Sequence, residues 1–275
     1  MIKHKLLHNL RLVTTPLTLA GRQRHLLWGF LLKETRGRFT GTIGGVLWAL
    51  INPVAMIAVY MFVFSIVLRV QVTVEETGTS TFAIYFLSGL LPWILFSEGL
   101  SRSVGCLVGN ASLITKVVFP VEVLPISAVL STFVINGLGM LVFWGFLLFA
   151  GYFSLTWLFL IFLVPAQILF TLGMACLLSA ACVFIRDISE LLGIVLILWF
   201  FATPIIYPIS MVPSEMLPFI SLNPMWTFVE LYRDLLLTHQ VCWASVVRVC
   251  LLSIGSYGIG AWFFMRAKPT FGDVL

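Results

Sequence analysis

The stretch from Glu122 to Arg186 contains no charged residue between its two ends. A bilayer core about 30 Å thick is crossed by roughly 20 apolar residues in a helix, so this stretch is long enough for two crossings and a turn. Lipid offers the backbone no hydrogen-bond partners, and such a run must therefore satisfy its own N–H and C=O groups as a helix. The chain is predicted to lie in a membrane.

Composition leads to the same conclusion. Of the 275 residues, 60% are hydrophobic and 10% are charged, whereas an ordinary soluble domain carries roughly 25% charged residues. The five cysteines are odd in number, form no CxxC pair and fall mostly in apolar runs. We therefore expect packing residues rather than disulfides, and no metal site.

Six apolar runs are predicted to span the membrane. They cover residues 43–68, 82–100, 124–150, 157–185, 191–208 and 243–265. The predicted fold class is thus an all-α membrane protein with six transmembrane helices.

The distribution of basic residues predicts the orientation. If the N-terminus is cytoplasmic, all but three of the sixteen Lys and Arg residues lie on the cytoplasmic side, and the exceptions are Arg69, Arg233 and Arg248. Positive charge concentrates in cytoplasmic loops, so both termini are expected in the cytoplasm. The net charge of +5 is then a membrane flank, and no nucleic-acid partner is predicted.

Two segments are neither spans nor ordinary loops. Residues 26–39 mix aromatic and basic side chains, which is typical of a helix lying in the headgroup plane, and residues 1–25 before them are expected to form a loosely ordered cytoplasmic arm. Residues 211–237 are apolar but interrupted by prolines. We interpret them as re-entrant half-helices between spans five and six, with a surface loop carrying one amphipathic helix as the alternative. Residues 26–275 would form one transmembrane domain.

Several local motifs occur together along the chain. They are RFTGTIGGVLW at residues 38–48, followed by Asn52-Pro53, then FPVEVLP at 119–125, Arg186-Asp187-Ile188, PIIYP at 204–208, and Asn223-Pro224-Met225 with Tyr232-Arg233. In this order they resemble the polysaccharide-export permeases of the ABC-2 type over about residues 26–264. Gly44 is a departure, because members of this family commonly carry a larger apolar residue there.

The resemblance implies a membrane subunit that exports O-antigen, capsule or teichoic acid polymers. No GxxxxGK[ST] phosphate-binding loop occurs in the chain, so ATP and Mg²⁺ are expected on a separate ATP-binding subunit and the chain itself is not expected to be an enzyme. Two copies of each subunit would form the transporter, with the channel at the interface of a homodimer. The preferred substrate is an O-antigen chain on undecaprenyl pyrophosphate, exported across a Gram-negative inner membrane.

Charged residues at the cytoplasmic ends are the candidate coupling and head-group sites. Lys116, Glu122, Arg186 and Asp187 would contact the ATPase, and Arg36 and Arg38 would bind the pyrophosphate head group. Simpler roles stay open: a helix-start charge for Glu122, mutual pairing or headgroup anchoring for Arg186 and Asp187, and nonspecific lipid contact for the two arginines. Glu98 is expected to pair with Arg102 one turn later.

Aromatic residues in spans one and five are the candidate channel lining. Sugar faces could stack on Tyr60, Phe64, Trp199, Phe200 and Tyr207, although aromatic residues also serve as lipid-facing filler and interface anchors. At the outer mouth, Trp226, Glu230, Tyr232 and Arg233 are candidates for a gate. Mutual pairing and helix capping are the simpler roles there.

Other classes of function fit less well. A capsule or teichoic acid exporter, or an ABC-2 drug or lipid exporter, remains open within transport. A membrane enzyme of lipid-linked sugar metabolism would need clustered acids at a span end, and the acids here are dispersed. A secondary transporter is disfavoured because no inverted repeat is evident.

Overall fold

The computed structural model describes residues 13–14, 16, 18, 21–117 and 119–275. Most of the predicted arm at residues 1–25 therefore lies outside the described residues. The described chain folds into a bundle of helices, with one isolated antiparallel bridge between Gln71 and Thr81. This confirms the all-helical class.

Five helical segments are long and apolar enough to cross a membrane. They are α3 (Trp48–Met61) with a π-helical turn at Phe62–Val67, α5 (Phe82–Val104), α8 (Val123–Phe149), α9 (Leu160–Phe184) after a 3-10 turn at Leu155–Phe159, and α13 (Trp243–Ala267). Five of the six predicted spans are thus long apolar helices. The prediction is confirmed to that extent.

The fifth predicted span differs from the expectation. Helix α10 (Ile188–Ala202) has 15 residues, which rise only about 22 Å at 1.5 Å per residue. It ends because Pro204 excludes its predecessor, Thr203, from helical geometry, and Thr203 is extended. The continuation to residue 208 is therefore wrong as a helix, and the six-span topology stays a prediction.

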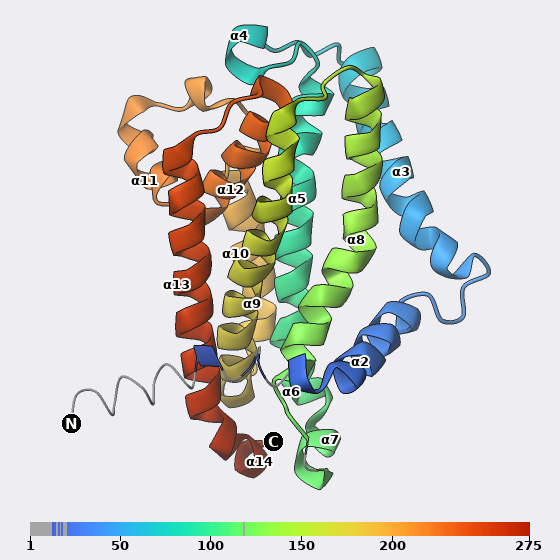
Figure 1. The fold of residues 1–275 in the computed structure, drawn as a ribbon, viewed down its shortest axis with the longest axis vertical. Coiled ribbons are helices and arrows are strands. Elements are labelled where there is room, and N and C mark those ends of the chain that lie inside the picture. The colour runs from blue at the N-terminus through green and yellow to red at the C-terminus, as the bar shows by residue number, and fades with distance from the viewer. Residues whose placement is uncertain (1–12, 15, 17, 19–20, 118) are drawn as a thin grey trace.

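The short helices gather at the two ends of the bundle (Figure 1). At the lower end of that view lie α6 (Cys106–Gly109), α7 (Ala111–Lys116) and α14 (Phe271–Val274), and α2 (Arg24–Gly37) lies obliquely beside the lower part of α8. At the upper end lie α4 (Val74–Thr77) and α11 (Leu217–Ser221). We call these the α7 end and the α4 end.

The segment between α10 and α13 turns back into the bundle. After 3-10 turns at Ile209–Met211 and Ser214–Met216 and helix α11, helix α12 (Pro224–Arg233) packs against α5, α9 and α13 and continues as a π-helical turn at Asp234–Thr238. Its side chains are mostly buried by protein. This packing is what a half-helix inside a bundle requires, and its depth in the membrane stays a prediction.

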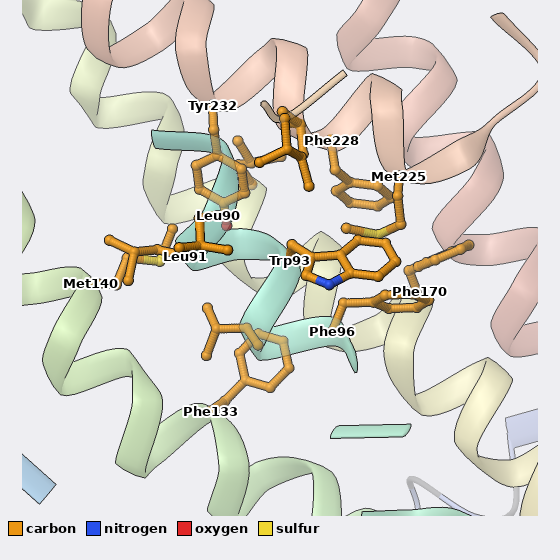
Figure 2. Packing of buried hydrophobic residues seen from close by; sticks show 14 of the residues in the cluster. Leu90, Leu91, Trp93, Phe96, Phe133, Met140, Phe170, Met225, Phe228 and Tyr232 are labelled. Carbon is orange, nitrogen blue, oxygen red and sulfur yellow. The ribbon is translucent and has the colours of Figure 1, made fainter. Parts of the chain in front are cut away.

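Helix α5 forms the centre of the core. It is buried along most of its length, whereas α3 and α10 expose most of their apolar side chains. Figure 2 shows Trp93 and Phe96 of α5 packed with Phe170 of α9 and Phe228 of α12. The Phe96 and Phe170 ring centroids are 5.6 Å apart and those of Phe170 and Phe228 are 5.2 Å apart, so one aromatic stack joins three helices.

Helices α9 and α13 make the closest helix contact in the bundle. A Cβ added to Gly173 would meet the backbone of Ser256, and one added to Gly260 would meet the backbone of Gly173. The Ser256 hydroxyl also donates a hydrogen bond to the Phe170 carbonyl at 2.9 Å. Small residues let two backbones approach in a membrane, where packing rather than the hydrophobic effect drives association.

We expect Gly260→Val to destabilise the bundle, because its new atoms would meet backbone that cannot move aside as a side chain could. Overpacking of this kind costs about 1–3 kcal/mol or more. The measurement is the Tm of purified protein in detergent. Gly258→Val is the matched control, since a Cβ at Gly258 meets nothing within 4 Å; equal losses in both variants would contradict the close contact.

Candidate functional site

A carboxylate with three donors joins helices α2, α5 and α8. Glu98 of α5 forms an ion pair with Arg38, the residue that ends α2, and its Oε1 accepts from Arg102 Nε at 3.0 Å. Asn136 of α8 donates from Nδ2 to the other oxygen, Oε2. The predicted pairing of Glu98 with Arg102 is confirmed, but the two further donors come from distant parts of the sequence. Charge-assisted hydrogen bonds of this kind are among the strongest in proteins.

This cluster forms one wall of a cavity of about 510 Å³. Its lining comprises Arg38, Phe39, Thr42, Trp48, Ala49, Asn52, Pro53, Glu98, Ile135 and Asn136. Burial, followed by the charge of Arg102, lowers the pKa of Arg38 to about 10, so Arg38 stays charged at neutral pH. A cation, two carboxamides and an indole in an apolar setting can hold a sugar or a phosphate group.

Two larger cavities lie beside α10. A groove of about 600 Å³ between α5 and α10 is lined by Glu98, Trp93 and Phe200, and an apolar cavity of about 840 Å³ is lined by Trp199, Tyr207 and the residues around α11. Glu98 belongs to the walls of the first cavity and of the groove, and Phe201 belongs to those of the groove and of the apolar cavity. The first cavity itself lies between Arg38, α3, α5 and α8.

The candidate channel aromatics form two separate groups. Tyr60 of α3 and Phe64 of the π-helical turn after it stack with centroids 6.1 Å apart and pack against Phe86 of α5. Trp199 of α10 packs against Phe96 at 5.2 Å, and Phe200 packs against Trp93 at 5.7 Å.

Each group lies against α5, and the structure does not bring the two groups together within one chain.

The fifth candidate, Tyr207, shares its cavity with Trp199 and donates a hydrogen bond to the Phe201 carbonyl at 2.9 Å.

Arg233 stabilises the non-helical residues 203–208 that follow α10, which we call the break. Its Nη1 donates to the Pro204 carbonyl at 2.7 Å and to the Tyr85 hydroxyl at 2.9 Å, while Nη2 donates to the Ile205 carbonyl at 3.0 Å. The guanidinium also lies 3.7 Å from the centre of the Tyr85 ring. Gly89 leaves room for it, since a Cβ there would come within 2.8 Å of Nη2. The carbonyls freed by the prolines are thus satisfied by protein rather than water.

Gln167 forms a second polar bridge through the core. Its Nε2 donates to the Pro92 carbonyl at 2.7 Å, and its Oε1 accepts from the Tyr232 hydroxyl at 2.8 Å. Helices α5, α9 and α12 are therefore linked by one buried amide. Our sequence reasoning missed Gln167 and Asn136, although an amide inside an uncharged span is a detectable pattern.

The four candidate gate residues differ in exposure. Tyr232 and Arg233 are buried, which places both away from an open mouth, whereas Trp226 and Glu230 are half-buried. Burial, reinforced by the nearby charge of Asp234, raises the pKa of Glu230 to about 7. Any gating role of Tyr232 and Arg233 must therefore act through the helices and backbone that they hold.

The four candidate coupling residues also divide. Lys116 on α7 is exposed, as are Arg186 and Asp187 between α9 and α10. These two form no ion pair with each other in the described chain. Glu122 is fully buried and pairs with Lys268, whose Nζ lies 2.8 Å from Oε2. Glu122 is thus covered by its own chain, and its contact with a partner subunit stays a prediction. Of the two candidate head-group residues, Arg36 is exposed and Arg38 is half-buried.

Five helices long and apolar enough to cross a membrane define a multi-pass membrane protein, and no metal-binding cluster occurs among the residues that the structure describes. The chain matches the ABC-2 type transporter family over residues 25–237 and belongs to that family. It is the transmembrane permease subunit of an ABC transporter, and the family implies an ATPase partner.

Similar proteins include O-antigen export permeases and a polysialic acid transport protein. The chain is 28% identical to the O-antigen export system permease protein RfbA of Klebsiella pneumoniae, over 88% of this chain and 92% of that protein. It is 33% identical to the RfbA permease of Myxococcus xanthus, over 79% and 82% of the two chains. It is 26% identical to the polysialic acid transport protein KpsM of Escherichia coli, over 77% and 81%.

We expect Arg233→Met to loosen the end of α10, because two carbonyls and a hydroxyl would lose their donor. Leaving such groups unsatisfied costs about 1–3 kcal/mol each, so Tm in detergent should fall by roughly 5 °C or more. Arg248→Met, which removes an exposed arginine of α13, is the control and should change Tm little. Arg233→Met with an unchanged Tm would argue against the role of Arg233 in holding the break.

Proposed function

We propose that the protein exports a lipid-linked polysaccharide, most closely an O-antigen chain on undecaprenyl pyrophosphate, across a bacterial inner membrane. The observation that carries this proposal is the match to the RfbA permeases over most of both chains. Three cavities that share Glu98 or Phe201 between neighbouring walls support it, because a polymer needs an extended path rather than a closed pocket. Both termini would lie in the cytoplasm, and the α7 end of the bundle would face it.

The transporter would contain two copies of this chain and two ATPase subunits. Helices α3 and α10 expose apolar faces that one chain leaves uncovered, and the two aromatic groups lie apart on α5. A second copy would supply the opposite wall of the path, so that Tyr60, Phe64, Trp199, Phe200 and Tyr207 could form successive surfaces for stacking sugar rings.

The head group would bind in the cavity beside Glu98. Arg38 is favoured over Arg36 because it lines this cavity and Arg36 does not. Two arginines share one carboxylate there, which leaves a net positive charge for a pyrophosphate. The bound phosphate would compete with Glu98 for the guanidinium of Arg38.

ATP hydrolysis would reach this chain at the α7 end. The exposed residues Lys116, Arg186 and Asp187 would contact the ATPase, and Glu122 would act behind them. At the α4 end, α12 with Trp226 and Glu230 would form the outer gate, positioned by Tyr232 and Arg233 through their contacts to α9 and to the end of α10.

A capsule polymer is the second candidate substrate. The observation that favours it is the similarity to KpsM, named for polysialic acid transport, over 77% of this chain. Proteoliposomes holding the permease and its cognate ATPase would distinguish the two. We expect ATP-dependent movement of undecaprenyl-linked polymer, and movement of a capsule polymer alone would overturn the O-antigen assignment.

We expect Arg38→Met to reduce export by roughly tenfold, since one charge-assisted contact is worth about 1.5–3 kcal/mol. Arg36→Met is the matched control and should retain most of the export. The double variant Arg38→Met with Glu98→Gln restores charge balance in the cluster. If it exports like the wild type, then Arg38 only neutralises Glu98 and does not bind substrate.

We expect Ala substitutions at Tyr60, Phe64, Phe200 and Tyr207 to slow export more than Trp262→Ala in α13, because each would remove a stacking surface worth about 1 kcal/mol. Polymer export at matched protein levels is the measurement. Equal effects in α13 would speak against a path along α3 and α10.

A further inference from the structure

A second apolar cluster lies at the α7 end, apart from the main core. Its buried members are Leu107, Val121, Leu124, Cys176, Ala180, Val183, Phe264 and Phe271. Phe271 of α14 packs edge-on against Phe264 of α13 with centroids 5.4 Å apart, and Phe119 stacks on Phe30 of α2 at 6.1 Å. We call this group the lower cluster. In the lower cluster, side chains of α2, of the α6–α7 segment and of the end of the chain pack around α9.

One buried carboxylate depends on the last turns of the chain. Glu122 is 0% exposed, and its Oε2 is 2.8 Å from the Nζ of Lys268. Its Oε1 is buried and has no hydrogen-bond partner within the described chain. Burial of a charge is unfavourable unless it is paired, so Lys268 is the cation that allows this carboxylate to stay inside.

The position of this pair connects two parts of the bundle. Glu122 directly precedes α8 and ends the connection that runs from α5 through α6 and α7. Lys268 follows α13, and α14 packs against α7 and α9. The ion pair and the Phe271 contact therefore fasten residues 268–275 to the segment that would meet the ATPase.

We propose that residues 268–275 are part of the coupling machinery, with Lys268 as a positioning residue. By holding Glu122, Lys268 keeps α7 rigidly joined to the start of α8 and the end of α13, so that a displacement of α7 moves these helices together. The stacked Phe119 and Phe30 rings extend the same joint to α2, which ends at Arg38. This inference rests on the proposed function, because it takes α7 as the contact for the ATPase.

The experiment compares Lys268→Met with Arg266→Met in the complete transporter, reconstituted with its ATPase subunits. Arg266 carries the same charge in the same region but is exposed and contacts the Trp262 ring rather than Glu122. Lys268→Met should lower Tm and yield, because it leaves the buried Glu122 unpaired. In the transporter that does assemble, compared at matched protein levels, we expect ATP hydrolysis to continue, with polymer exported per ATP reduced by roughly fivefold or more, a size typical of coupling residues. Arg266→Met should keep the wild-type ratio, and a wild-type ratio in Lys268→Met would overturn the proposal.

A double variant separates positioning from mere stability. Glu122→Gln with Lys268→Met removes the unpaired buried charge, and such neutral replacements are often tolerated. We expect it to recover Tm and yield but not export per ATP, because the tether is still missing. Full recovery of the export ratio would mean that Lys268 only neutralises Glu122, and would overturn the proposal.

A readout that needs no substrate keeps this inference distinct from the proposed function. Labels at Thr115→Cys on α7 and Lys33→Cys on α2 report whether ATP binding moves α2 together with α7. If the wild type exports no polymer but the ATP-driven change is present and Lys268→Met abolishes it, the substrate assignment fails and the coupling role stands. If the change is the same in both proteins, the coupling role fails.

Discussion

The constraint that shapes this protein is the absence of water around most of its backbone. A chain that interrupts a helix inside a bilayer must satisfy the freed carbonyls from within. At Pro204 and Ile205 that task falls to Arg233, a buried cation that makes hydrogen bonds to both carbonyls and lies on the Tyr85 ring. The turn after α10 and the return of α12 into the bundle depend on this interaction, because without Arg233 the carbonyls of Pro204 and Ile205 would lose their donor.

Helix α5 organises the rest. It carries Tyr85 beneath the break, Pro92 at the Gln167 bridge and Glu98 at the arginine cluster. These three polar contacts lie along one helix whose other side chains form the apolar core. Most of α5 is buried, whereas α3 and α10 leave apolar faces exposed. In the proposed transporter, α5 would form one wall of the polymer path and these exposed faces would be left for the opposite wall.

Charge is arranged differently at the two ends. At the α7 end, Lys116, Arg186 and Asp187 are exposed, and the buried Glu122 pairs with the partly exposed Lys268, which ties the chain's last turns to the segment before α8. Near the α4 end, the buried charge is Arg233, which donates to two backbone carbonyls. In the proposed transporter, the first arrangement would suit the end that meets the ATPase and the second would suit the outer gate.

Apolar run length and the distribution of basic residues were enough to predict five of the membrane-crossing helices, the helix around residues 26–39 and, through the local motifs, the transporter family. Those features are local, since a helix in lipid satisfies its own backbone and needs no distant partner. Other features depended on tertiary structure. The partners of Glu122, Gln167 and Arg233 lie 28 to 148 residues away in sequence, and no pattern along the chain specifies which polar groups will meet inside the bundle. The burial of Glu122 and the sharing of Glu98 by two arginines were decided by how the helices pack, because only packing determines which charges lose water and must find each other.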